Sequence, residues 1–425
     1  MIRESVFYPF FPWKTACLYF FMSLDKFNNY GDKMEYLVDF IAPEYLDYFS
    51  SWELIPSENK MIDSLVETEI YPVQGKEIFL KAMEEAVAYH LENNRKYRSF
   101  LEYYNFKKGN IGSLEMLEKL PWICVDEFKN RDLHSIRPVE YVYTLNSSGT
   151  SGKKSYNNLD LISLNREFMM DYLVHREMGV LDADKDCNIL LFTNDIKTHQ
   201  TSGMTFSSYV ISDMVNYKRR EHLLHVVGGR NTFPIDNALK IYREFVDSGL
   251  PVRWIGYPAF MYKLAVEIKK RGLPRLDAAH ESWIQTSGGW KNLANEEIGF
   301  DEFCLILNEA TGIGSDNIRD LYGASEHGVG YLECCCHKKH VPVFSHVVSR
   351  DPYTLEVNKN GEVGLLHFFT PVLRSLPSLS LLSTDFGSVT YENCSCGISG
   401  PVINFVRRAG KKMNDTCALR ILKEF

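Results

Sequence analysis

The stretch VEYVYTLNSSGTSGKK, residues 139–154, joins a strand-like run to a Ser/Gly/Lys-rich run. Its first part, Val139–Leu145, has the β-branched and aromatic content of a strand. Its second part, Asn146–Lys154, supplies hydroxyls, two glycines and two lysines. Glycines let backbone N–H groups approach an anion closely, and Lys153 or Lys154 can neutralise phosphate charge. The stretch therefore predicts a phosphate-binding loop between a strand and a helical region.

Two other interpretations of this loop are a Walker A motif and a flexible linker. A Walker A loop is excluded, because Lys154 stands where that motif needs Ser or Thr. A flexible Ser/Gly linker stays an alternative, although linkers rarely begin directly after a strand.

The pattern on both sides of the loop predicts an α/β protein. Residues 75–103 have the apolar spacing of one long amphipathic helix. Short apolar runs at Asn188–Thr193, Leu223–Val227 and Val252–Ile255 alternate with helical stretches, which is typical of a largely parallel sheet. From Val341 onwards, short strands and turns indicate a small β-rich subdomain. We therefore expect four parts: a mostly helical region 1–120, an α/β core 121–335, the β-rich subdomain 336–406, and a hinge with a short tail 407–425.

Composition excludes several classes of function. The chain has 425 residues, a net charge of −8, and no basic footprint of the kind that broad nucleic-acid binding needs. Its ten cysteines are unevenly spaced, which favours a reducing compartment and metal or catalytic thiols over disulfides. The apolar run Val6–Met22 contains two prolines and a lysine and is too short for a spanning helix. It lacks a basic leader, so we expect a cytoplasmic protein without a membrane span.

The loop and three later segments together resemble a known superfamily. SSGTSGKK resembles the Ser/Thr/Gly-rich signature of the adenylate-forming enzymes, which include acyl-CoA synthetases and luciferases. Residues 321–326 (LYGASE) resemble their Tyr-Gly-x-Thr-Glu motif, and residues 382–387 (LSTDFG) resemble their Thr-Gly-Asp motif. Arg408 resembles the arginine at the hinge that ends the large domain. The resemblance implies the α/β large domain of these enzymes, with mixed or parallel sheets, flanking helices and a small β-rich part.

The resemblance also implies that the chain uses ATP and Mg²⁺. Lys153 and Glu326 would be catalytic, and Glu326 would also bind Mg²⁺. Asp385 would accept hydrogen bonds from the ribose. Arg408, or Arg407 in its place, would face the ribose or the α-phosphate. The full expected ATP-binding set is Ser147, Ser148, Gly149, Thr150, Ser151, Gly152, Lys154, Gly288, Gly289, Lys291, Tyr322 (stacked on adenine), Gly323, Ser325, Asp385 and Arg408.

Two of these assignments have plain structural alternatives. Glu326 could be a surface carboxylate in a loop. Residues 286–291 (TSGGWK) could form an ordinary β-turn. Neither alternative needs a bound nucleotide.

Further segments resemble one branch of the superfamily, the acyl-protein synthetases, which activate fatty acids in bacterial luminescence reductase complexes. These segments are 125–129 (VDEFK), 288–291 (GGWK), 340–343 (HVPV), 351–356 (DPYTLE) and 361–366 (GEVGLL). The resemblance implies a carboxylic acid substrate, plausibly a fatty acid, and an acyl-CoA-reductase-like or acyl-carrier partner. Because the chain ends at Phe425, we expect the usual C-terminal lid to be missing or reduced to a tail. Cys417 in that tail would be the catalytic acyl acceptor.

The sequence alone leaves two other functions open. The chain could be an acyl- or aryl-CoA ligase similar to phenylacetate-CoA ligase, or a catalytically degenerate protein that only binds nucleotide or acid. Cys417 could be a buried structural cysteine. The acid pocket is expected within Asn194–Ser208 and Trp254–Tyr262, which do not reveal the chain length of the acid.

Cysteines and a histidine cluster in the second half of the chain. Cys334, Cys335, Cys336 and His340 are followed later by Cys394 and Cys396. Two such pairs fit a tetrahedral Zn²⁺ site of N/S ligands with a structural role. We expect Cys334 or Cys336 to bind the ion together with His340, Cys394 and Cys396. Reduced cysteines without a metal are the alternative.

Overall fold

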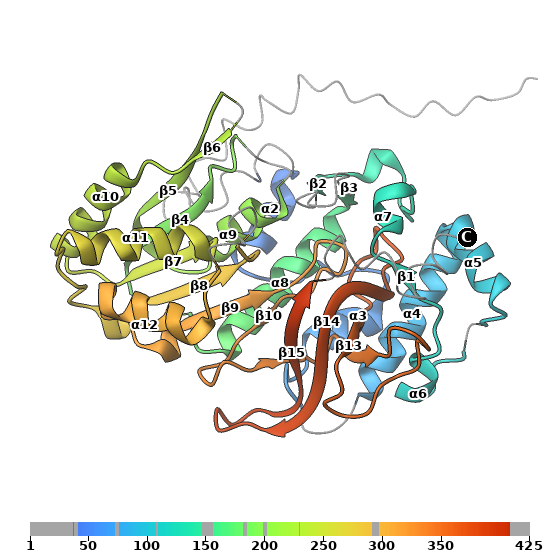
Figure 1. Ribbon diagram of the computed structural model, residues 1–425. Helices are drawn as coiled ribbons and strands as arrows, with labels where there is room; N and C mark the ends of the chain where they lie inside the picture. The colour runs from blue at the N-terminus through green and yellow to red at the C-terminus, as the bar shows by residue number, and fades with distance from the viewer. Residues whose placement is uncertain are drawn as a thin grey trace, which may run out of the picture.

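Two sheets and one short hairpin contain the strands of the computed structural model (Figure 1). It describes residues 37, 41–72, 76–107, 109–146, 156–181, 185–198, 202–228, 230–290 and 297–408. The seven-stranded sheet consists of β10 (Tyr331–Leu332), β9 (Ile318–Tyr322), β8 (Trp283–Ser287), β7 (Val252–Gly256), β4 (Cys187–Asn194), β5 (Tyr217–Val227) and β6 (Arg230–Thr232). The six-stranded sheet consists of β11 (Lys339–His340), β15 (Ser399–Arg408), β14 (Ser380–Asn393), β13 (Gly364–Phe369), β12 (His346–Arg350) and β1 (Ile123–Cys124).

Helices cover both faces of the seven-stranded sheet. Three of them, α10 to α12, line its outer face in Figure 1, whereas α8 and α9 lie on the other side. Of the N-terminal helices, α3 to α6 lie on the side of the six-stranded sheet in Figure 1, whereas α2 contacts α8. The bounds are α2 Pro43–Ser50, α3 Lys60–Val66, α4 Glu77–Asn93, α5 Arg95–Tyr103, α6 Leu114–Leu117, α7 Glu127–Asn130, α8 Leu161–Glu177, α9 Gly203–Asp213, α10 Ile235–Asp247, α11 Pro258–Lys270 and α12 Phe300–Thr311.

The predicted parallel sheet is confirmed, and β4 shows why its sequence is so apolar. This strand pairs in parallel with both β5 and β7, and all eight of its residues are buried. Ile189 and Leu191 belong to the core that contains α8 and α9, whereas Leu190 and Phe192 belong to the core that contains α10 to α12. A strand covered on both faces is apolar throughout because neither set of side chains reaches water.

The expected order of strand, phosphate loop and helix is wrong. A second strand, β3 (Tyr156–Leu159), pairs antiparallel with β2 (Tyr143–Asn146) before α8 begins. The predicted strand also starts too early, because residues 138–140 form a 3₁₀ turn. Pro138 fixes φ there, and the Glu140 carboxylate accepts a hydrogen bond from the backbone N–H of Arg137 at 2.9 Å. Residues 147–155 between the two strands lie outside the described part.

The single helix expected over 75–103 is also wrong, because it is divided at Asn94. The Asn94 side chain accepts a hydrogen bond from the N–H of Tyr97 and thereby caps α5. The same side chain donates to the carbonyl of Leu133 at 2.8 Å. Apolar spacing continues across the break, so periodicity alone did not reveal it.

The predicted β-rich region after Val341 corresponds to the six-stranded sheet, in which β14 and β15 form a long antiparallel hairpin. The sheet also takes in β1, which lies far earlier in the chain and pairs in parallel with β14. The described residues contain no helix long and apolar enough to cross a membrane. The apolar run Val6–Met22 lies outside those residues.

Candidate nucleotide and metal sites

The end of β9 meets β14 at Asp385, an interior position of that strand, where the two sheets approach each other. Tyr322, the last residue of β9, donates a hydrogen bond from its hydroxyl to Asp385 Oδ2 of β14 at 2.7 Å. Arg408 lies opposite Asp385 in the antiparallel pairing of β14 and β15. Tertiary structure thus brings three expected nucleotide-binding positions together. The carboxylate expected to bind ribose is already hydrogen-bonded to the ring expected to stack on adenine.

The loop after β9 turns back tightly over its own strand. A Cβ at Gly323 would lie 3.3 Å from the carbonyl oxygen of Val329, so glycine allows this close approach. Ser325 Oγ donates to Glu326 Oε2 at 3.2 Å, and Glu326 is only 4% exposed. The surface interpretation of Glu326 is therefore wrong. A buried carboxylate beside a serine hydroxyl is a suitable hard-oxygen ligand for Mg²⁺.

Strand β2, which leads into the expected phosphate loop, ends beside the loop that follows β9. Asn146 forms a bridge with Ser202, which caps α9. A Cβ at Gly203 would lie 3.7 Å from the carbonyl oxygen of Asn146 and 3.8 Å from Ser325 Cβ. Nine expected residues, however, lie outside the described part of the chain: Ser147, Ser148, Gly149, Thr150, Ser151, Gly152, Lys153, Lys154 and Lys291. Cys417 lies outside it as well.

Gly288 and Gly289 follow β8, and both have left-handed backbone geometry, with φ of +76° and +66°. A Cβ at Gly288 would lie 3.0 Å from Tyr257 Cε1 and 3.1 Å from Met204 Sδ. Tyr257 and Met204 come from the two segments in which the acid pocket is expected. Those segments therefore converge beside Gly288, where a side chain would fill the space.

Phe405 is a residue that the sequence analysis missed. It lies on β15 with 40% of its surface exposed, and its ring centroid is 5.4 Å from that of Tyr322. An aromatic side chain so exposed beside Tyr322 is available to contact a flat ligand. The one signal in the sequence was an aromatic residue close to Arg408, and strand pairing was needed to relate it to Tyr322.

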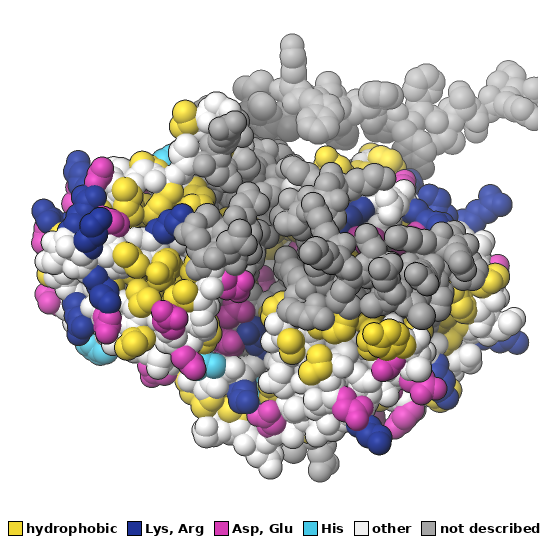
Figure 2. Space-filling model, viewed as in Figure 1, with side chains coloured by type: hydrophobic (Ala, Val, Ile, Leu, Met, Phe, Trp, Pro, Cys, Tyr) yellow, Lys and Arg dark blue, Asp and Glu magenta, His cyan; other side chains and the backbone are white. Residues whose placement is uncertain are grey.

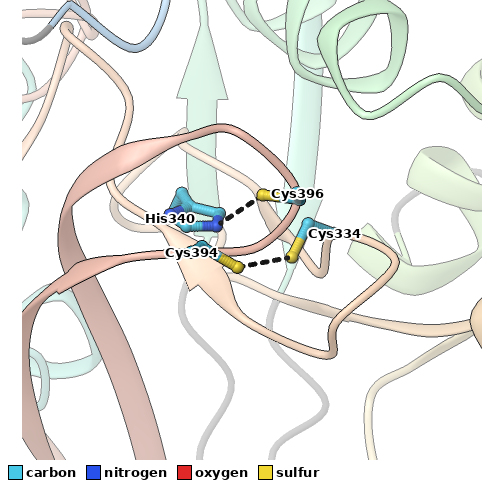
Figure 3. Close-up of side chains that lie close together, drawn as sticks. All are labelled: Cys334, His340, Cys394 and Cys396. Carbon is cyan, nitrogen blue, oxygen red and sulfur yellow. Dashed lines mark hydrogen bonds between the residues drawn. The ribbon is translucent and has the colours of Figure 1, made fainter.

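Four expected zinc ligands lie together between β11 and the tip of the β14–β15 hairpin. Their ligand atoms, from Cys334, His340, Cys394 and Cys396, all lie within 4.8 Å of one another and point toward one another in Figure 3. Cys334 Sγ is 3.9 Å from Cys394 Sγ, and Cys396 Sγ is 3.4 Å from His340 Nε2 (Figure 3). Cys336 is outside this set, and its Sγ lies 3.1 Å from Ser395 Oγ.

Two turns of the same design present the cysteines. In one, Cys334 N–H donates to the carbonyl of Lys338, and His337 N–H donates to the carbonyl of Cys334, both at 2.9 Å. In the other, Cys394 and Gly397 make the corresponding bonds at 3.1 and 3.0 Å. The residue with positive φ is His337 (+57°) in the first turn and Gly397 (+96°) in the second. A non-glycine residue at such φ costs free energy, so the first turn is held by its surroundings.

Burial controls the charge of this cluster in the absence of a cation. It raises the pKa of the Cys334 thiol to about 12 and lowers the pKa of the His340 ring. Both groups are therefore neutral at pH 7. A bound Zn²⁺ would supply the positive charge that stabilises thiolates at this place.

Comparisons with known proteins match most of the chain. The family model described as "Acyl-protein synthetase, LuxE" matches residues 56–425. The long-chain-fatty-acid–luciferin-component ligase of Aliivibrio fischeri is 25% identical over 362 residues, which cover 81% of this chain and 88% of that protein. The ligase of the same name from Vibrio harveyi is 25% identical over 361 residues. It covers 83% of this chain, and 89% of its own length is matched.

Solved structures identify the fold. A 2-hydroxyisobutyryl-CoA ligase in complex with 2-HIB-AMP and CoA superposes with a TM-score of 0.60 at 14% identity, over 85% of this chain and 73% of that one. At this identity the likeness shows the fold alone, which is that of the adenylate-forming ligases, as expected from the sequence. The family match extends over most of the sequence, from Pro56 to Phe425, and the chain therefore belongs to the acyl-protein synthetase family.

Proposed function

We propose that this protein is an ATP-dependent acid ligase that activates a long-chain fatty acid as acyl-adenylate and passes the acyl group to its own Cys417. One observation carries the proposal: Tyr322, Asp385 and the position of Arg408 converge at the meeting of the two sheets. The family relatives named as long-chain fatty acid ligases support the class of acid. Adenylate-forming ligases generally use ATP and Mg²⁺.

In the first step a carboxylate oxygen of the acid attacks the α-phosphorus of ATP. A new P–O bond forms, the bond to the β-phosphate oxygen breaks, and pyrophosphate leaves. The backbone N–H groups and lysines of residues 147–154 would stabilise negative charge on the phosphates. Asp385 would hold the ribose, while Glu326 would hold Mg²⁺, which neutralises phosphate charge when bound.

In the second step the Cys417 thiolate attacks the carbonyl carbon of the mixed anhydride. The bond to the phosphate oxygen breaks, AMP leaves, and a thioester remains on the tail. A partner protein of the acyl-CoA-reductase type would then receive the acyl group. A phenylacetate-CoA ligase of Thermus thermophilus is 28% identical over 158 residues, 34% of this chain, so transfer to coenzyme A is the second candidate.

We also propose a structural Zn²⁺ held by Cys334, His340, Cys394 and Cys396. In a tetrahedral site with Zn–S bonds of about 2.3 Å, two sulfur ligands lie about 3.8 Å apart. The 3.9 Å between Cys334 Sγ and Cys394 Sγ fits that value and is far too long for a disulfide. The ion would join the loop after β10 to the tip of the β14–β15 hairpin.

Mass spectrometry after incubation with ATP, Mg²⁺ and fatty acids of different length tests the acyl transfer. We expect acid-dependent pyrophosphate release and an acyl adduct on Cys417. The Cys417→Ser variant should keep pyrophosphate release and lose the adduct. Cys335→Ser is the matched control, because Cys335 is an exposed thiol outside the zinc set, and it should keep both.

Other outcomes would overturn parts of the proposal. Acyl-CoA formation that persists in the Cys417→Ser variant would indicate a CoA ligase. No acid-dependent pyrophosphate release with any acid would indicate a binding protein. For zinc, elemental analysis should find one ion per chain in the wild type and none in a Cys394→Ser/Cys396→Ser variant.

A further inference from the structure

A cluster of three charged side chains, Glu333, Lys339 and Asp320, lies between the turn of residues 334–340 (the Cys/His turn) and the expected nucleotide site. Lys339 Nζ is 2.6 Å from Glu333 Oε1 and 3.2 Å from Asp320 Oδ2. The Lys339 and Glu333 side chains are only 10% and 8% exposed, whereas Asp320 is 35% exposed. In Figure 2, acidic side chains gather in the middle of this face, in the region where Figure 1 shows β9 and β10. The proposed ATP, acid and zinc sites do not include these three side chains.

One end of the cluster is part of the Cys/His turn. Glu333 directly precedes Cys334, and Lys339 directly precedes His340. Glu333 and Lys339 also form a backbone bridge across the turn. A change in the position of Cys334 or His340 would therefore move the adjacent ion pair of Glu333 and Lys339.

The other end of the cluster is fixed to the strands that lead into the nucleotide site. The Glu333 carboxylate accepts from the N–H of Asp320 at 2.9 Å, and its own N–H donates to the Asp320 carbonyl at 3.1 Å. Asp320 Oδ1 accepts from Thr286 Oγ1 on the neighbouring strand at 2.8 Å. Asp320 stands two residues before Tyr322, and Thr286 stands two residues before Gly288.

Strand geometry makes this spacing meaningful, because residues two apart on a strand point to the same face. The Asp320 side chain therefore lies on the same face of β9 as the Tyr322 side chain. Its hydrogen bond from Thr286 connects this face of β9 to β8. The Lys339 ammonium pairs with both the buried Glu333 carboxylate and the partly exposed Asp320 carboxylate and so offsets their mutual repulsion.

We propose that Lys339 is a positioning residue for the nucleotide, which ties the Cys/His turn 334–340 to the ends of β8 and β9. The inference rests on the proposed function, in which Tyr322 and Gly288 contact the nucleotide. It also gives the zinc site a purpose, because a metal that orders the turn would order the nucleotide site through Lys339.

The experiment compares ATP affinity by calorimetry, together with the KM values for ATP and for the acid, in three variants. Lys339→Met combined with Glu333→Gln keeps the net charge of the cluster but removes the Lys339 ammonium that pairs with Asp320. Lys339→Arg keeps the cation. The matched control is Lys338→Met, because Lys338 is the adjacent lysine and pairs with Glu392 at the surface, where the two are 37% and 30% exposed.

We expect the double variant to weaken ATP binding at least tenfold while the KM for the acid stays within twofold. Lys339→Arg should bind ATP within about threefold of the wild type, and Lys338→Met should be unchanged. Wild-type ATP affinity in the double variant would overturn the inference. So would an equal loss of ATP and acid affinity, which indicates general disruption. A wild-type chain that binds no ATP would overturn the proposed function as well.

A second measurement tests the connection to the Cys/His turn. Replacing the ligands by Cys394→Ser/Cys396→Ser should also weaken ATP binding. If Lys339 carries the effect, adding this change to the Lys339→Met/Glu333→Gln variant should cost much less than the two separate losses combined, since coupled residues are not additive. Full additivity would refute the connection.

Discussion

Asp385→Asn is the sharpest test of the nucleotide site. The substitution keeps the shape of the side chain and its ability to accept the hydrogen bond from Tyr322, which is 2.7 Å long in the wild type. It removes the negative charge that a ribose hydroxyl would meet. The change therefore isolates the charge of one carboxylate on β14.

The expected magnitude follows from hydrogen-bond energetics. A hydrogen bond to a charged group contributes about 1.5–3 kcal/mol net, whereas a neutral one contributes about 1 kcal/mol. Two bonds from the ribose to Asp385 would together lose about 1–4 kcal/mol when the charge is removed. Since about 1.4 kcal/mol corresponds to a factor of ten, the dissociation constant for ATP should rise about 5- to 1000-fold.

Acid-dependent exchange of pyrophosphate into ATP measures this effect. The KM for ATP should rise while the KM for the acid stays nearly constant. Tyr322→Phe serves as the control, because it removes the hydroxyl that bonds Asp385 and keeps both the ring and the carboxylate. It should change the KM for ATP only a few-fold. The reasoning fails if Asp385→Asn leaves ATP affinity within twofold, or if Tyr322→Phe is equally harmful.

Three further predictions concern buried positions of the fold. Gly288→Ala places a Cβ at φ +76° and should lower the free energy of unfolding by about 1–2 kcal/mol. It should also raise the KM values for both ATP and the acid, whereas unchanged values would refute the crowding argument. Asn94→Ala removes the cap of α5 and a buried bond and should cost about 2 kcal/mol in urea unfolding, while the exposed Asn93→Ala should cost little. Burial lowers the pKa of His90 to about 3, so below pH 6.5 the unfolded chain takes up a proton that the folded chain does not. Stability should fall by about 2 kcal/mol between pH 7.5 and 5 on this account. His90→Gln should abolish that part of the fall, and the exposed His280→Gln should keep it.

Local patterns in the sequence predicted the element types well and their ends poorly. The apolar run Asn188–Thr193 predicted a strand of a largely parallel sheet, and it lies within β4, which is buried along its whole length. The break at Asn94 was missed because a capping residue inside a periodic pattern looks like any polar position on a helix. The strand β3 was missed because YNNL is mostly polar, and only its pairing with β2 makes it a strand.

The candidate sites were predictable in composition but not in arrangement. Cysteine and histidine spacing indicated a zinc site, yet spacing could not distinguish Cys334 from Cys336. The fold distinguishes them, because the turn bonds of Cys334 direct its Sγ toward Cys394. Phe405 and Lys339 carried no motif, and their relation to Tyr322 and Asp320 exists only through strand pairing and packing.

Residue types at short spacing were enough to indicate the family of the protein and its α/β class, and the phosphate-binding role of residues 146–154 stays a prediction. Which distant residues meet depends on the tertiary structure. Tyr322 and Asp385 lie on different sheets, and their hydrogen bond depends on how those sheets pack. The same holds for the ion cluster of Lys339. Packing of buried apolar surface fixes such long-range contacts, and no local pattern in the sequence encodes them.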